Sequence, residues 1–196
     1  MEVVTSINFA IWVVFMVCYL YQMYYILVPY IKKDKPLGPP KENRFAVLIS
    51  ARNEANVIKQ LLDSINAQTY PAELIDVYVV ADNCTDATAA IAKRCGANVY
   101  ERFDTVNVGK GYALNYLLRE ISKKYGHDYY DGYFVFDADN VLDPHYIEAM
   151  NGTFSSGYEI LTSYRNSKNY GDNWISAGYA LWFLRESKYL NYSRML

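Results

Sequence analysis

One stretch of the 196-residue chain, residues 7–31, contains no Asp, Glu, Lys or Arg. A helix of about 20 apolar residues can cross the hydrocarbon core of a bilayer, and this stretch is longer than that. A secretory signal peptide would begin with basic residues and would have a shorter apolar region. This chain begins MEVVTS, without Lys or Arg. The sequence therefore predicts a single N-terminal transmembrane anchor over residues 1–31.

Basic residues lie on only one side of this anchor. Lys32, Lys33 and Lys35 follow it, and no basic residue precedes it. Because Lys and Arg accumulate in cytoplasmic loops, we expect the N-terminus outside and the rest of the chain in the cytoplasm, as in a single-pass protein of the cell membrane. A buried core helix, or a helix lying in the membrane interface, is the alternative, because Gln22 and several tyrosines lie near one end of the stretch.

The composition argues against several functions. A net charge of −2 with 20% charged residues gives no sign of a basic surface, so we expect no nucleic-acid partner. The three cysteines form no CxxC pair and have no metal-ligand spacing, so they are expected to be reduced thiols. Only two histidines occur, and no constellation of a nucleophile with a base is evident, which argues against a hydrolase triad.

Beyond a Pro- and Lys-rich linker at residues 32–43, short apolar runs alternate with segments of helical periodicity. Strands are expected at residues 44–50, 75–81, 98–102 and 133–137, with a possible fifth at 159–164. Helices are expected at residues 54–68, 85–95, 110–125 and 144–150, and in the aromatic segment 172–196. The membrane surface is one location that would suit this aromatic segment. This alternation predicts an α/β fold with a mostly parallel sheet and helices on both faces.

Polar side chains gather where three of the expected strands end. The segments SARNE (residues 50–54), DNCTD (82–86) and DADN (137–140) each follow a strand. Lys110 stands between two glycines at the start of an expected helix. Ligands of open parallel sheets bind outside the carboxyl ends of the strands, so we expect a ligand site at this edge.

Asp137 and Asp139 follow an apolar strand and are separated by one residue. Two neighbouring carboxylates repel each other unless a cation lies between them, and oxygen ligands suit Mg²⁺ or Mn²⁺. Such an ion can stabilise a departing diphosphate. The pattern therefore indicates a metal and phosphate site. The alternative is a solvated turn that caps the next helix.

The other residues at this edge each have two interpretations. Asp82 can accept a hydrogen bond from a ring N–H or a ribose hydroxyl, or it can cap the next helix, for which Asn83 or Thr85 is also suited. Lys110 can bind phosphate, because its glycine neighbours let the backbone approach a ligand. Glu54 either contacts a ligand or complements the dipole of the helix that it is expected to begin.

Four segments taken together resemble the family 2 glycosyltransferases of the GT-A fold, especially the membrane-anchored bacterial members of processive type. They read ISARNEANVIKQLLDSINAQTYP, VYVVADNCTDATAAIA, VGKGYALNYLL and YFVFDADNVLDPHYIEAM, and they lie within residues 44–150. The resemblance implies a GT-A, Rossmann-like domain that uses Mg²⁺ or Mn²⁺ and a nucleotide-sugar, most often a UDP-sugar. It also implies inverting transfer at the cytoplasmic membrane face, as in polysaccharide biosynthesis, with the sugar and acceptor left open.

The resemblance assigns roles to individual residues. Ala51, Arg52 and Glu54 match the motif that borders the nucleoside, Asp82 matches the aspartate that contacts the base, Lys110 matches the lysine near the diphosphate, and Asp137 and Asp139 match the D-x-D motif. Asp137 is thus expected to contact both donor and metal, and Asp139 is expected to be the direct metal ligand. Asn83 stands where many members carry a second aspartate.

The catalytic base of the family, usually an aspartate in an E-D or T-E-D stretch, has no match in this chain, and Q-x-x-R-W is also absent. We therefore expect a nucleotide-sugar-binding domain at residues 44–165 and the beginning of an acceptor region at 166–196. Such a chain would be a truncated or a split glycosyltransferase that binds donor and transfers little alone, and a second polypeptide would complete it if it is split. The alternative is a non-catalytic, membrane-anchored nucleotide-binding or interaction protein that retains the fold.

Overall fold

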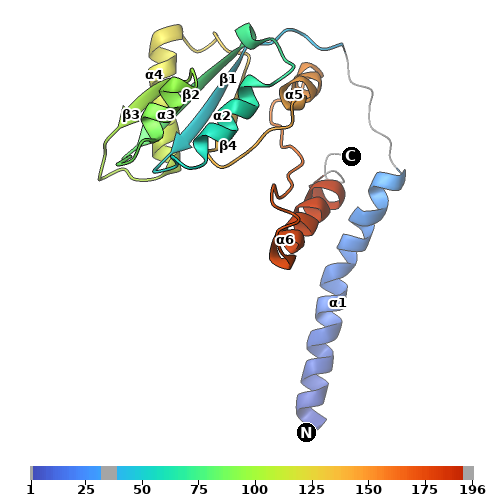
Figure 1. Cartoon of the computed structure of the whole chain (residues 1–196). Helices are drawn as coiled ribbons and strands as arrows, with labels where there is room; N and C mark the ends of the chain where they lie inside the picture. The colour runs from blue at the N-terminus through green and yellow to red at the C-terminus, as the bar shows by residue number, and fades with distance from the viewer. Residues whose placement is uncertain (1, 32–38, 192–196) are drawn as a thin grey trace. The chain divides into compact units, whose positions relative to one another are not determined.

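The structure, a computed structural model, describes residues 2–31 and 39–191 (Figure 1). The chain divides into two compact units. We call the described residues 39–159 the α/β unit, and the described residues 2–31 and 160–191 the helical unit. Lys32, Lys33 and Lys35, on which the expected membrane orientation depends, lie outside the described residues.

The α/β unit is built on four parallel strands in the order β3-β2-β1-β4. The strands are β1 (Phe45–Ala51), β2 (Ile75–Asp82), β3 (Asn98–Arg102) and β4 (Gly132–Asp137). The two central strands, β1 and β2, carry the longest apolar runs, and most of their residues are buried. The mostly parallel α/β sheet predicted from the sequence is therefore confirmed.

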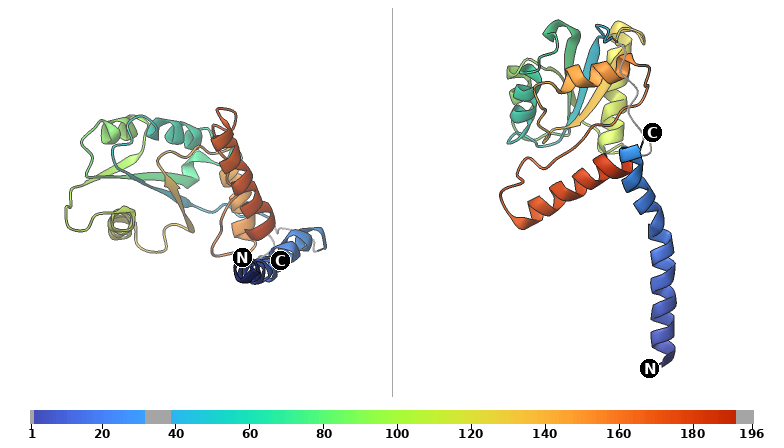
Figure 2. Two further views of the ribbon diagram at one scale, coloured as in Figure 1. Left: turned by 90° about the horizontal axis from the view of Figure 1, so that it is seen from below. Right: turned by 90° about the vertical axis from the view of Figure 1, so that its right-hand side faces the viewer.

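Helices cover both faces of this sheet, as Figure 2 shows for α4 on one side and α2 and α3 on the other. Successive strand residues point to opposite faces, so Val47 and Ile49 pack with α2 and α3, whereas Ala46 and Leu48 pack with α4. The helices of this unit are α2 (Ile58–Asn66), the short 3₁₀ turn η1 (Ala72–Leu74), α3 (Thr88–Arg94), α4 (Lys110–Tyr125) and α5 (Tyr146–Ser155).

Several boundaries differ from the sequence prediction. The helix α2 begins at Ile58 rather than at residue 54, because residues 54–57 form a turn that is closed by hydrogen bonds to the carbonyl oxygen of Glu54. The helix α3 begins at Thr88, so neither Asn83 nor Thr85 caps it. Residues 159–164 form no strand, since an extended segment becomes a strand only when it pairs with another.

The strand β4 forms one edge of the sheet, and among the described strands it pairs only with β1. Its side chains alternate between the two faces. Phe134 and Phe136 pack toward the core, whereas Tyr133, Val135 and Asp137 are exposed. The exposed face of β4 is therefore apolar near its middle and acidic at its carboxyl end.

A polar network ties the strands together at their amino ends, away from the predicted ligand edge. The hydroxyls of Tyr78 and Tyr130 are 2.6 Å apart, and the Tyr130 hydroxyl donates to Asp76 at 2.8 Å. Arg44 forms an ion pair of 3.0 Å with the same carboxylate. Burial raises the pKa of both tyrosines well above the ordinary value, so the hydroxyls stay neutral and remain hydrogen-bond donors.

The helical unit contains α1 (Glu2–Ile31), α6 (Trp174–Arg185) and a π-helical turn, η2 (Glu186–Asn191). Residues Glu2–Val28 of α1 are long and apolar enough to cross a membrane, and the apolar window within them is not buried inside the protein. The Asn173 side chain caps α6 by accepting hydrogen bonds from the N–H groups of Ile175 and Ser176, each at 3.0 Å. The predicted helical character of the aromatic segment is confirmed for these residues.

Candidate functional site

Three strand ends bring the predicted residues to one edge of the sheet. The registers pair Ala51 at the end of β1 with Ala81 of β2, and Ser50 with Asp137 at the end of β4. Lys110 begins α4 at the same edge, because its Nζ lies 2.5 Å from Asp137 Oδ1. The structure therefore brings together residues that lie up to 88 positions apart in the sequence (residues 51–139).

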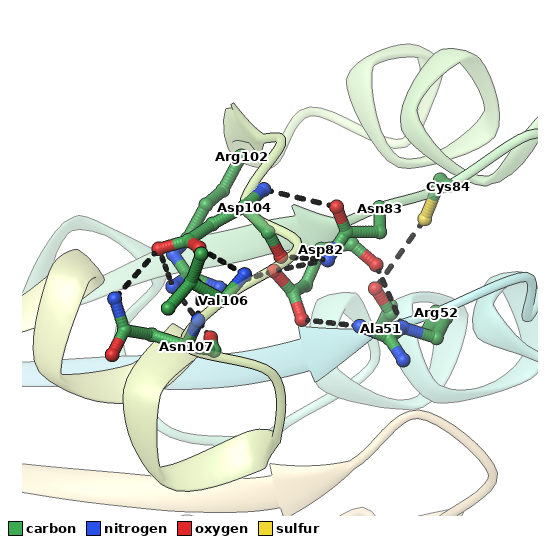
Figure 3. Close-up of polar contacts among 9 residues, drawn as sticks. All are labelled: Ala51, Arg52, Asp82, Asn83, Cys84, Arg102, Asp104, Val106 and Asn107. Carbon is green, nitrogen blue, oxygen red and sulfur yellow. Dashed lines mark hydrogen bonds and ion pairs between the residues drawn. The ribbon is translucent and has the colours of Figure 1, made fainter.

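Asp82, the predicted base contact, is buried and held by two arginines (Figure 3). Its Oδ1 accepts from Arg102 Nη1 at 2.6 Å, and its Oδ2 accepts from Arg52 Nη2 at 3.0 Å. Arg52 also donates through Nε to the carbonyl oxygen of Asp82 at 3.2 Å. A buried carboxylate is tolerated when it is paired in this way, so Asp82 is a rigid, charged acceptor rather than a helix cap.

Arg102 is central to this cluster but was not singled out from the sequence. It is only 8% exposed, and it also donates to Asp104 Oδ2 at 2.7 Å and to the carbonyl oxygen of Asn107 at 2.8 Å. It thereby holds the loop that leads to Lys110. No local sequence pattern marks Arg102, because its importance comes from the pairing of β2 with β3, which sets Asp82 opposite Arg102.

The contacts of Asn83 explain why an amide suits this position, where the resemblance to the family would allow a second aspartate. Its Nδ2 donates to the carbonyl oxygen of Asp104, and its Oδ1 accepts from the Asp104 N–H, both at 3.0 Å. An ionised aspartate could accept but could not donate. The backbone of Asn83 has a φ of 53°, in the left-handed region that Asn tolerates better than most residues. Asn83 therefore locks the β3–α4 loop against the end of β2.

The loop after β1 is fixed mainly through backbone contacts. Ala51 is fully buried, and its carbonyl oxygen accepts from Cys84 Sγ at 3.4 Å. The N–H of Glu54 donates to the Thr88 hydroxyl at 2.8 Å. Because Glu54 lies before α2, the expectation that it begins this helix is wrong. Asn53 Oδ1 accepts from the Thr85 N–H at 2.8 Å and joins this loop to the next one.

The D-x-D segment presents two exposed carboxylates on either side of the buried Ala138. Asn140 organises the segment, because its Oδ1 accepts from the Asp137 N–H at 3.1 Å and its Nδ2 donates to Asp139 Oδ1 at 3.3 Å. Lys110 provides the positive charge beside Asp137.

No group of three or more His, Cys, Asp or Glu side chains that could hold a metal occurs among the residues that the structure describes. Two exposed carboxylates nevertheless fit a hard divalent ion that keeps several waters and binds substrate phosphates, which is the usual state of Mg²⁺. The donor set of Asp137 and Asp139 therefore suits a metal shared with a phosphate ligand.

The stability of this edge is expected to fall in acid. Hydrogen bonds from the N–H groups of Asn107 and Val106 hold the pKa of Asp104 below its ordinary value of 3.8, and the hydroxyl and N–H of Thr88 do the same for the pKa of Asp86. A carboxyl whose pKa is lower in the folded chain stabilises it above the ordinary pKa, and this contribution is lost as the pH falls through the folded value. Urea midpoints measured from neutral pH down to about pH 3 should fall less steeply for Asp104→Asn than for the wild type. Parallel profiles would contradict this assignment.

A family model described as glycosyltransferase like family 2 matches residues 40–195. The chain belongs to glycosyltransferase family 2. Both the family and the GT-A-type fold predicted from the sequence are thus confirmed.

Individual relatives of this family 2 chain match it only in part. A 4,4'-diaponeurosporenoate glycosyltransferase of Staphylococcus aureus (strain MRSA252) is 40% identical over 70 residues, which cover 36% of this chain and 18% of the relative. The mannosyltransferase PcManGT from Pyrobaculum calidifontis, in complex with GDP-Man and Mn²⁺, is 23% identical, with a TM-score of 0.56. That match covers 74% of this chain and 43% of the mannosyltransferase. The chain therefore spans less than half the length of these relatives, and the structural likeness concerns the fold alone.

Proposed function

We propose that this family 2 chain is the donor-binding module of a glycosyltransferase. It binds a nucleotide-sugar, with a UDP-sugar as the first candidate, together with Mg²⁺ or Mn²⁺. The observation that carries the proposal is the convergence of the paired Asp82, the Lys110 ammonium and the D-x-D carboxylates at one sheet edge. A structural cluster alone would not need two exposed carboxylates and a lysine beside them.

Each predicted residue has a proposed role in binding the donor. Asp82 accepts a hydrogen bond from the base, and its charge is kept in place by Arg102. Ala51 ends β1 beneath the proposed nucleoside site, while Arg52 and Glu54 lie on the loop that follows it. The side chain of Arg52 is 44% exposed and so can meet a ligand without leaving a buried position.

Asp137 and Asp139 would hold the divalent ion, which when bound neutralises charge on the diphosphate and makes it a better leaving group. The Lys110 ammonium, which meets Asp137 in this structure, turns its donors toward the diphosphate oxygens. An acceptor hydroxyl then attacks the anomeric carbon, the bond from that carbon to the diphosphate oxygen breaks, and a base takes the hydroxyl proton. We assign no residue of these 196 as that base. If the chain is one part of a split enzyme, a second polypeptide supplies the acceptor half.

The location we propose is the cytoplasmic face of the cell membrane. The helix α1 would cross the bilayer once, and Lys32, Lys33 and Lys35 would keep the α/β unit in the cytoplasm. A membrane-bound acceptor would then meet the donor site at the surface, although the sugar and the acceptor class are left open by the residues.

The test is a calorimetric titration of UDP and GDP into the detergent-solubilised full chain, with Mn²⁺, with Mg²⁺ and with a chelator. We expect UDP to bind in the presence of metal and to bind much more weakly with the chelator. GDP is included because the mannosyltransferase neighbour is described with GDP-Man and Mn²⁺. Binding of neither nucleotide by a folded sample would overturn the proposal and favour the alternative, a membrane-anchored interaction protein that retains the fold. Robust sugar transfer by the chain alone would contradict the inference that this chain lacks the catalytic base.

Replacing Lys110 by alanine should weaken the binding of UDP by about 10-fold or more, because a hydrogen bond to a charged phosphate is lost. The affinity for uridine, which has no phosphate, should stay the same. Lys123→Ala is the matched control, since this lysine is on the same helix and pairs with Glu120 at 2.6 Å. Equal losses for UDP and uridine would mean that Lys110 supports the fold of the loop rather than binding phosphate.

A further inference from the structure

The helix α6 carries a continuous aromatic and aliphatic surface, which we call the α6 face. It consists of Trp174, Ile175, Tyr179, Leu181 and Trp182, and all five side chains are exposed, Trp174 by 83%. At 100° per residue, these positions fall within an arc of roughly 160° around the helix. Ser176 and Ala180 lie on the opposite side and are buried.

The α6 face has the chemistry of a surface that meets lipid. Trp and Tyr combine an apolar ring with a polar tip, and both are enriched where hydrocarbon meets water. No charged residue occurs in α6 before Arg185, its last residue. A run of large exposed apolar side chains of this kind is unusual on a soluble surface and marks an interaction site.

Contacts within the helical unit connect α6 to the candidate span. Arg185 donates a hydrogen bond to Gln22 of α1, and η2 packs against α1. In α1, Gln22, Tyr25 and Val28 are less exposed than their neighbours and share one side of the helix. Gln22 lies six residues before Val28, the last residue of the candidate span, which corresponds to roughly 9 Å along the axis. The C-terminal end of α6 therefore meets α1 close to where α1 would leave the bilayer (Figure 2).

We propose that the α6 face lies in the interfacial layer of the same bilayer that α1 crosses, with its Trp and Tyr rings at the level of the lipid headgroups. This proposal depends on α1 being a span, which is part of the proposed location, but it is independent of the donor site. The occupant is lipid rather than a protein partner because α6 meets α1 near the end of the candidate span, and because its exposed face carries interfacial residue types.

Fluorescence quenching in lipid nanodiscs tests the depth of the α6 face directly. The full chain has three tryptophans, and replacing two of them by phenylalanine in turn leaves Trp12, Trp174 or Trp182 as a single reporter. We expect the two α6 reporters to lose more fluorescence to lipids brominated near the headgroup than to lipids brominated near the chain end. Both should also be shielded from iodide, relative to the same variants in the unfolded chain.

The Trp12 reporter, inside α1, is the control for the span and should respond more to deep bromine than the α6 reporters do. If Trp12 responds while Trp174 and Trp182 are open to iodide and insensitive to brominated lipid, the span stands and the α6 proposal is overturned. Shielding from both quenchers would also overturn it, because protein would then cover the face. If brominated lipid did not quench the Trp12 reporter, α1 would not cross the bilayer and the α6 proposal would also be overturned. Nucleotide is absent throughout, so a failed donor site cannot affect these outcomes.

Discussion

Replacing Asp139 by asparagine is expected to weaken the metal-dependent binding of UDP by about 100-fold or more. The substitution keeps the size of the side chain and removes the charge that a divalent ion needs from an oxygen ligand. Removing even the outer-sphere partners of a metal site commonly costs 10- to 100-fold in metal affinity, and Asp139 is proposed to touch the ion directly. The measurement is the dissociation constant of UDP for the full chain with Mn²⁺ and with chelator.

Asp128→Asn provides the matched control, because it removes the same charge from an exposed position just before β4, at the end opposite Asp137. It should retain the wild-type affinity for UDP and the wild-type dependence on metal. If Asp139→Asn also retained both, the D-x-D segment would be a solvated turn and any metal would be held elsewhere.

Replacing Arg102 by methionine is expected to lower the free energy of unfolding by about 3 kcal/mol. Arg102 is buried and pairs with Asp82 at 2.6 Å and with Asp104 at 2.7 Å. Methionine fills much of the same volume but leaves the buried Asp82 carboxylate with only the partly exposed Arg52 as its ionic partner. Breaking a buried pair from one side is costly because a charge remains without compensation. Urea unfolding of the full chain, followed by circular dichroism, measures this loss against the wild type.

The control for Arg102→Met is a substitution in an ion pair that is equally short but exposed. Lys93 and Glu101 are 2.7 Å apart, and their side chains are 55% and 45% exposed. Lys93→Met should therefore cost less than about 1 kcal/mol. Similar losses of unfolding free energy in the two variants would contradict the claim that the buried Arg102 pairs stabilise the fold more than an exposed pair does. The Arg102→Met chain should also bind UDP more weakly, because the loop before Lys110 loses the contact that holds it.

The sequence predicted the elements whose apolar pattern is strong. The helix α4 has the expected bounds, because Leu117 and Ile121 repeat on the face that packs against the sheet. Helix starts were less predictable, since they depend on which polar group closes the first turn. Asp86, rather than Thr85, accepts the Thr88 N–H at 2.9 Å, and the start of α3 shifts accordingly.

The site was predictable to the extent that it follows from strand ends. Asp82 and Asp137 each stand directly after an apolar run, and Asp139 is two positions beyond Asp137, so their common edge could be inferred from the sequence. Arg102 could not be inferred in that way. Its importance comes from the register of β2 against β3, which joins residues 20 positions apart, and no local pattern fixes that register.

Among the strands that the structure describes, β4 pairs only with β1, and its other edge has a consequence for the D-x-D segment. An unpaired edge is a template to which another extended segment can add. A strand that joined there would lie about 4.8 Å from the backbone of β4, which ends at Asp137. Any segment that extended the sheet would thus arrive beside the D-x-D carboxylates, next to the proposed donor site. Extension of the sheet and completion of that site would then be one event, controlled by the docking of the added segment.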